Sequence, residues 1–163
     1  MKKLILTLST LLITIISYCQ HQTISVNGIE LDKKYTQSQI YNILGTPKSI
    51  EPYEDGPWCA YKYNNSYFSF KYDDWVLVDG LIKDTIYKVN NYLTVGIHSD
   101  LIKAMKGYVV YEESKSFKDT IYMYWAPSKE YRDNVGYIQI IINKQTKIIE
   151  MIGVETQEFH DYY

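Results

Sequence analysis

Residues 36–45 read Thr-Gln-Ser-Gln-Ile-Tyr-Asn-Ile-Leu-Gly, and this stretch predicts a short helix with clear ends. Thr36 is a suitable N-cap residue, and Gln39 stands three positions later, which is the spacing of a capping box. Gly45 follows the last helical position, and Pro47 comes soon after it, as is common where a helix ends. The apolar side chains expected on one face of this helix are Ile40, Ile43 and Leu44. Such a helix needs another apolar surface on which to pack.

A second stretch with a similar pattern lies at residues 98–107, His-Ser-Asp-Leu-Ile-Lys-Ala-Met-Lys-Gly. When the two stretches are aligned, Ile40 matches Ile102 and Gly45 matches Gly107. Self-similarity over a long spacing indicates an internal repeat. We therefore expect two copies of one structural unit, each beginning with a short helix.

Each predicted helix is followed by segments that have the pattern of β-strands. The expected strands are 58–63, 67–70, 75–78, 81–89, 120–125, 135–142 and 147–154. Asp79-Gly80 is expected to form the tight turn of a hairpin, and residues 126–134 a polar loop. The predicted fold class is α+β, with two tandem repeats that each contain a short helix followed by about three to four mainly antiparallel strands. Strand order, and whether the repeats share one sheet, stay open.

The helix ends carry a resemblance to a known group of proteins. The run Leu44-Gly45-Thr46-Pro47 and the second stretch, 95–107, are similar to the helix motifs of the SmpA/OmlA and β-lactamase-inhibitor-protein-like group. The tandem layout covers nearly all of residues 24–154 and resembles the two-repeat inhibitors more than the single-module proteins. The resemblance implies a secreted helix-and-sheet module. The inhibitors carry cysteine pairs that this chain lacks, so the resemblance supports the fold far more than an activity.

The first nineteen residues have the layout of a secretory signal peptide. Lys2 and Lys3 precede an apolar run over residues 4–16, which is too short to be a spanning helix. We expect cleavage after Cys19, a secreted or periplasmic protein, and no transmembrane span once the signal is removed. A lipid anchor on Cys19 is the minority alternative, because bulky Tyr18 stands before it. The expected division is a signal peptide (1–19), two αβ repeats (20–90 and 91–154) and a C-terminal tail (155–163).

The composition is that of an ordinary globular chain. It has 163 residues, of which 46% are hydrophobic and 22% charged, and its net charge is -2. Because there is no overall positive field, we expect no nucleic-acid partner. Cys59 is the one cysteine outside the signal segment, so we expect no intramolecular disulfide. Its neighbours Trp58, Ala60 and Tyr61 predict a small buried residue rather than a nucleophile.

The sequence holds no pattern typical of an active site or a metal centre. His21, His98 and His160 are far apart along the chain, whereas metal sites need clustered ligands. The adjacent carboxylates are Glu54-Asp55, Asp73-Asp74 and Glu112-Glu113. Each pair stands beside a predicted turn, where solvated carboxylates are common. We therefore expect no catalytic residues, no metal and no cofactor, and we expect the protein not to be an enzyme.

Tyrosine is unusually frequent, with 18 residues. Alternate residues of a strand face opposite sides, so a dense aromatic run cannot all enter one core. The rest would form an exposed face, and Tyr and Trp are enriched at protein-binding and sugar-stacking surfaces. The expected binding residues are Tyr53, Trp58, Tyr61, Tyr63 and Trp125. We predict a non-enzymatic module that binds an unidentified envelope or extracellular protein, in an unknown oligomeric state. The alternative is a carbohydrate- or small-ligand-binding envelope protein.

Overall fold

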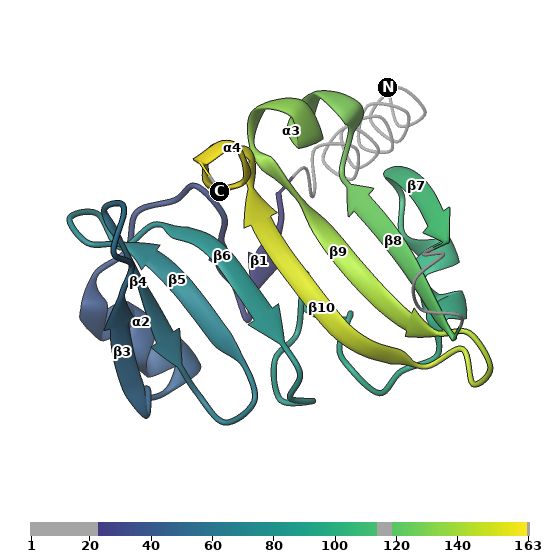
Figure 1. The fold of residues 1–163 in the computed structure, drawn as a ribbon, viewed down its shortest axis with the longest axis horizontal. Coiled ribbons are helices and arrows are strands. Elements are labelled where there is room, and N and C mark those ends of the chain that lie inside the picture. Colours follow the sequence, from purple (N-terminus) through teal and green to yellow (C-terminus); the bar gives the residue numbers. More distant parts are fainter. Residues whose placement is uncertain (1–22, 114–118, 163) are drawn as a thin grey trace, which may run out of the picture.

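The protein consists mainly of one eight-stranded antiparallel sheet (Figure 1). The computed structural model describes residues 23–113 and 119–162, so the predicted signal peptide and Cys19 lie outside the described residues. The strands are β3 (Ser49–Pro52), β4 (Trp58–Lys62), β5 (Tyr67–Lys71), β6 (Leu77–Ile82), β7 (Tyr108–Glu113), β8 (Thr120–Ala126), β9 (Gly136–Asn143) and β10 (Ile149–Thr156). The other elements are the small hairpin of β1 (Ser25–Val26) and β2 (Ile29–Glu30), the helices α2 (Gln37–Leu44), α3 (Lys129–Asn134) and α4 (Gln157–Tyr162), and the 3₁₀ helix η1 (Ser99–Ala104). The predicted α+β class is confirmed. Within the described residues no helix is long and apolar enough to cross a membrane.

The strand order is β3-β4-β5-β6-β10-β9-β8-β7, so β3 to β6 form one half of the sheet and β7 to β10 the other. The halves meet where β6 pairs antiparallel with β10, with Leu81 opposite Gly153 and Asp79 opposite Glu155. One continuous sheet therefore runs through both halves of the chain, which answers a question the sequence left open. The repeat boundaries 20–90 and 91–154 stay a prediction.

The first predicted helix is confirmed, capping box included. The Thr36 side chain accepts a hydrogen bond from the Gln39 amide, and the Gln39 side chain accepts one from the Thr36 amide at 2.8 Å. Gly45 ends α2 with φ of 88°, a conformation that glycine adopts without strain. Ile40 and Leu44 are buried, but Ile43, expected on the same face, is exposed. The second predicted helix is instead the 3₁₀ helix η1, which His98 caps.

The hairpin predicted at Asp79-Gly80 is wrong, because β6 runs straight through both residues. Gly80 is needed there for space rather than for a turn. A Cβ on Gly80 would lie 2.7 Å from Cδ1 of Phe68, a ring that packs against the strand at this point. The predicted continuation to residue 89 does not form either, since β6 ends at Ile82.

Two further segments differ from expectation. Within the predicted loop 126–134, residues Lys129–Asn134 form α3, and the Ser128 hydroxyl caps this helix by accepting from the Tyr131 amide at 3.0 Å. Within the predicted tail, residues 155–156 complete β10, and Gln157–Tyr162 form α4. Ser128 is a typical N-cap residue and could have indicated α3, but the polar composition of the segment predicted a loop instead.

The core lies on one face of the sheet. The strand register aligns one residue from each of the eight strands in a row on this face. These residues are Ile50, Tyr61, Phe68, Gly80, Val154, Ile138, Trp125 and Val109. This face packs against α2, the β1–β2 hairpin and η1, which contribute buried Ile40, Val26 and Ile102. In Figure 1, α2 and β1 lie behind the sheet. The opposite face of the sheet is therefore available for other contacts.

Candidate functional site

The face of the sheet opposite the core carries polar and aromatic residues, and we call it the open face. One row of directly opposed residues consists of Glu51, Ala60, Ser69, Asp79, Glu155 and Tyr137. The next row consists of Lys62, Tyr67, Leu81, Gly153, Gln139, Tyr124 and Val110. Directly opposed residues of antiparallel strands point to the same side, so both rows share one surface. Most of these side chains are partly exposed.

Asp79 is at the centre of the open face, where β6 and β10 join the two halves of the sheet. Its Oδ2 accepts a hydrogen bond from Ser69 Oγ at 3.3 Å, and the Tyr67 hydroxyl donates another to the carboxylate. The Tyr53 hydroxyl lies 3.0 Å from Ser69 Oγ. Because Ser69 has one proton and gives it to Asp79, Tyr53 donates to Ser69. A chain of hydroxyl groups thus ends on the Asp79 carboxylate.

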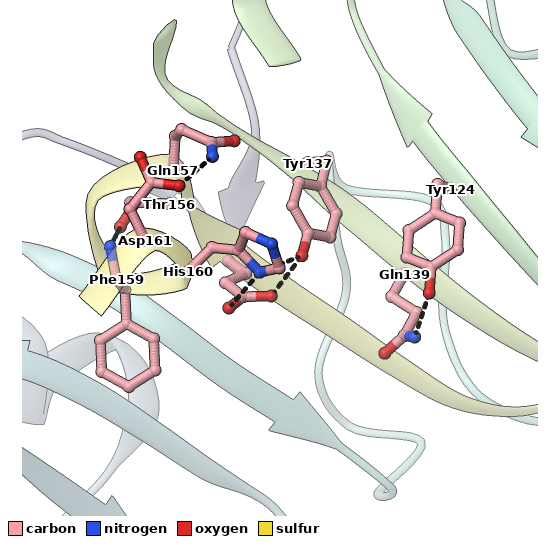
Figure 2. Close-up of polar contacts among 9 residues, drawn as sticks. Tyr124, Tyr137, Gln139, Thr156, Gln157, Phe159, His160 and Asp161 are labelled. Carbon is pink, nitrogen blue, oxygen red and sulfur yellow. Dashed lines mark hydrogen bonds and ion pairs between the residues drawn. The ribbon is translucent and has the colours of Figure 1, made fainter. Parts of the chain in front are cut away.

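Glu155 faces Asp79 from β10 and has partners of its own. The Tyr137 hydroxyl donates to Glu155 Oε2 at 2.5 Å. His160 of α4 places Nδ1 3.4 Å from Glu155 Oε1 and 3.2 Å from the Tyr137 hydroxyl. Figure 2 shows the His160 ring turned toward Tyr137. The carboxylate is therefore held in place from β9 and from α4.

The space between these groups is a hollow of about 370 Å³. The residues that line it are Tyr53, Tyr67, Asp79, Gly80, Leu81, Gln139, Gly153, Val154, Glu155 and Phe159. Gly153 has no side chain to fill the space between Leu81 and Gln139, its neighbours in the row. We call this depression the Asp79 hollow.

Two similar depressions flank the Asp79 hollow on the same face. One, toward β3 and β4, is lined by Glu51, Pro52, Tyr53, Glu54, Ala60, Lys62 and Tyr67. The other, toward β8 and β9, is lined by Val110, Tyr124, Arg132, Asp133, Tyr137, Gln157 and His160. Tyr53 and Tyr67 are common to the first depression and the hollow. The open face is therefore a sheet surface with a line of shallow depressions.

Two carboxylates opposed across neighbouring strands repel each other, and burial strengthens the effect. Burial first, and then the negative charge of Glu155, raise the pKa of Asp79 to about 7. The hydrogen bonds from Tyr67, Ser69 and the Gly80 amide lower this pKa but do not offset the rise. Asp79 therefore changes its charge near neutral pH, unlike an ordinary surface aspartate.

α4 covers one end of the open face. Phe159 packs there in a small apolar cluster with Trp58, Val76 and Val78, beside Tyr53. Its ring centroid lies 5.3 Å from that of Trp58. An ion pair of 2.6 Å between Lys71 and Glu158 also joins α4 to β5. The helix therefore bounds the open face and positions His160.

The five residues expected to bind a partner have different places in the structure. Tyr61, Tyr63 and Trp125 are buried in the main core. Trp58 points to the open side but is buried beneath α4. Tyr53 is partly exposed and lines two of the depressions. Four of the five side chains are thus buried, because strand alternation turns Tyr61 and Trp125 into the core and α4 covers Trp58.

Sequence reasoning missed Asp79 and Glu155, which it assigned to a turn and to the C-terminal tail. A detectable signal was that Asp79 lies within the apolar run from Val76 to Ile82, where a lone carboxylate is unusual. The buried state predicted for Cys59 is confirmed, since 2% of its surface is exposed and burial raises the pKa of its thiol. His98 and His160 lie on different elements, and His21 is outside the described residues.

The adjacent carboxylates lie in different settings. Asp73 and Asp74 lie in a turn, and Glu54 and Asp55 in an irregular segment between β3 and β4, where solvated groups were expected. Glu112 and Glu113 belong instead to β7. Over the described ranges, no group of three or more His, Cys, Asp or Glu residues is placed to hold a metal ion. Chemically, the open face offers hydrogen-bond acceptors, hydroxyl donors and tyrosine rings.

No family model and no curated protein matches this chain, so the resemblance noted from the helix motifs stays a prediction. Three solved structures share part of the arrangement. An extracellular protein containing an SCP domain from Bacillus anthracis is 14% identical with a TM-score of 0.48, over 80% of this chain and 47% of its own. A cysteine-rich secretory protein from Staphylococcus aureus is 18% identical with a TM-score of 0.43, and the match covers 77% of this chain and 45% of that protein. A DUF4309 family protein from Bacillus subtilis is 16% identical with a TM-score of 0.43, and the match covers 80% of this chain and 83% of that protein. The chain thus spans about half the length of the first two proteins.

Proposed function

We propose that this protein is an exported, non-enzymatic binding module that attaches to another protein of the bacterial envelope or exterior through its open face. The observation that carries the proposal is the open face itself, with its line of shallow depressions and its partly exposed tyrosines. α4 packs on this face where Phe159 meets Trp58, and α3 borders it beside β8 and β9, where Arg132 and Asp133 line a depression. The middle of the face is accessible.

The chemistry of the open face suits protein recognition. Tyr53, Tyr67 and Tyr124 combine apolar rings with hydroxyl groups, and such side chains are enriched at binding hot spots. Leu81 and Val110 add apolar area between them. A surface of this kind gains affinity when water is displaced from its depressions by a complementary side chain.

Export is part of the proposal, and its support is the layout of residues 1–19. A basic start, an apolar run and small residues near Cys19 are typical of a secretory signal. We propose a secreted or periplasmic location for the protein.

The direct test compares capture of envelope and extracellular proteins by the tagged protein and by variants. Tyr67→Ala combined with Tyr124→Ala removes two rings from the open face, and we expect at least tenfold weaker capture of the specific partner. Tyr92→Ala is the matched control, because Tyr92 is exposed and lies in the segment that pairs with β1 on the core side. Equal capture by the double variant and the wild-type protein would overturn the proposal.

A second candidate function is binding of a carbohydrate or another small ligand at the same face. The hollow favours it, because carboxylate and hydroxyl groups stand beside tyrosine rings there. Saturable chemical-shift changes at Gly153 and Gln139 on addition of envelope glycans, without capture of any protein, would favour this function over the first.

A further inference from the structure

We propose that the Asp79 hollow is the specificity pocket of the open face and that it binds the guanidinium group of an arginine side chain presented by the partner protein. This inference rests on the proposed function, because the arginine belongs to the partner. It names the chemistry of one contact on a surface otherwise described only by its shape.

Charge complementarity is the first argument. Two of the described residues that line the hollow are carboxylates, Asp79 and Glu155, and none is basic. The nearby lysines are engaged elsewhere, since Lys62 pairs with Glu51 and Lys71 pairs with Glu158. A cation placed between the opposed carboxylates would turn their repulsion into two attractions.

The free acceptor positions are the second argument. An ionised carboxylate has about four lone-pair directions. Asp79 uses some of them for Ser69, Tyr67 and the Gly80 amide, and Glu155 uses Oε2 for Tyr137 and has His160 Nδ1 3.4 Å from Oε1. Fewer than four partners are thus described for each carboxylate, and both residues line the hollow. A guanidinium group carries five donors in a planar fork, so it can bond two carboxylates at once.

The walls and the floor of the hollow are the third argument. Tyr67 and Tyr53 line it with aromatic rings, which attract a flat cation. At Gly153 a Cβ would lie 3.4 Å from Cβ of Gln139, so a larger side chain there would occupy the space. An anion is disfavoured by the two carboxylates, and no third metal ligand joins them in the parts of the chain that the structure describes.

Binding of a cation in the hollow depends on pH. The groups that face Asp79 are Glu155 on β10, and Tyr67 and Ser69 on β5. Behind them, Tyr53 contacts Ser69, and His160 on α4 contacts Glu155. Arginine binds the ionised form of Asp79, so affinity should rise as the pH increases through about 7, the pKa of Asp79 in the free protein.

The test is an NMR titration of the purified protein with N-acetyl-L-argininamide, with the neutral isostere N-acetyl-L-citrullinamide as the control ligand. We expect saturable shifts at Asp79, Gly153 and Glu155 with the arginine probe only. Asp79→Asn combined with Glu155→Gln should weaken binding by at least about tenfold. Glu150→Gln removes one exposed charge near the start of β10, outside the three depressions, and should leave binding unchanged. Gly153→Val keeps both carboxylates and fills the hollow, so it should also abolish binding.

The outcomes separate this inference from the proposed function. Equal shifts with the two probes, or unchanged arginine binding in the Asp79→Asn, Glu155→Gln double variant, would overturn the arginine pocket. Partner capture that is lost with the open-face tyrosine variants but unaffected by Gly153→Val would overturn the pocket while leaving the open face as the binding surface. Arginine binding without capture of any protein would overturn the protein partner, and with it the assignment of the arginine to that partner.

Discussion

Asp79 shows how one residue changes its chemistry through its neighbours. On an exposed turn it would be an ordinary ionised carboxylate, but on β6 it lies partly buried and opposite Glu155. Hydroxyl groups of Tyr67 and Ser69 hold it in position. A residue that is costly to keep ionised and is nevertheless fixed in place is a common sign of a functional site.

We predict that Asp79→Asn stabilises the protein at neutral and alkaline pH. The unfolded chain loses the Asp79 proton near 3.8, whereas the folded protein keeps it until about pH 7. Between these values the folded state binds more protons, so stability falls as the pH rises, by about 2 to 4 kcal/mol in total. Asparagine keeps an acceptor for Ser69 and removes this loss. Urea denaturation of wild type and variant from pH 4 to pH 8 measures the difference. Parallel pH profiles for the two proteins would contradict the prediction.

Two glycines on neighbouring strands give a matched pair of predictions. Gly80 faces the core, where a Cβ would lie 2.7 Å from Phe68 Cδ1, whereas Gly153 faces the open side and has 3.4 Å to its nearest neighbour. Gly80→Ala should therefore destabilise the protein by about 1 to 3 kcal/mol. Gly153→Ala should change stability by less than about 0.5 kcal/mol. Thermal unfolding of both variants tests the assigned faces. A larger loss of stability in Gly153→Ala than in Gly80→Ala would show that the two faces are exchanged.

Among the helices and strands, short sequence patterns predicted α2 correctly. They gave a wrong prediction where contacts between residues far apart in the sequence determine the structure. The capping box of Thr36 and Gln39 marks the start of α2 within four residues, so a local pattern was enough to predict this helix. Asp79-Gly80 has the composition of a tight turn, yet Phe68 requires a glycine opposite its ring and the strand continues. Such a long-range contact is invisible to a short sequence pattern.

The candidate site was harder to predict than the elements. The open face depends on which alternate residues of each strand point away from the core, and a shift of one residue reverses the choice. Tyr61 and Trp125 were expected at a surface and lie in the core, whereas Tyr67 and Tyr124 lie on the open face. Only the observed register distinguishes the two sets.

Phe159 is expected to be the main contact that holds α4 on the sheet. Phe159 is 8% exposed and packs between Trp58 and Tyr53. Phe159→Ala should destabilise the protein by about 3 kcal/mol and should shift Trp fluorescence to the red as Trp58 becomes hydrated. Glu158→Gln, which breaks only a partly exposed ion pair, should cost less than about 1 kcal/mol. An unchanged emission spectrum in the Phe159→Ala variant would show that α4 is held by other contacts.

At the scale of the whole molecule, the two halves of the chain meet at the centre of the site. β6 ends the first half and β10 the second, and their pairing brings Asp79 and Glu155 together although 76 positions separate them. Neither half alone contains the hollow. The core face holds the halves together through a shared apolar layer, which leaves the open face free for recognition (Figure 1).

Oxidative footprinting of the captured complex, with the reactivity of each tyrosine measured by mass spectrometry, shows which face of the protein binds the partner. If the open face is the binding surface, Tyr67 and Tyr124 lose reactivity when the partner is bound, while exposed Tyr92 on the opposite side keeps it. Protection of Tyr92 with unchanged reactivity of Tyr67 and Tyr124 would contradict the account, because the partner would then lie on the other side of the protein.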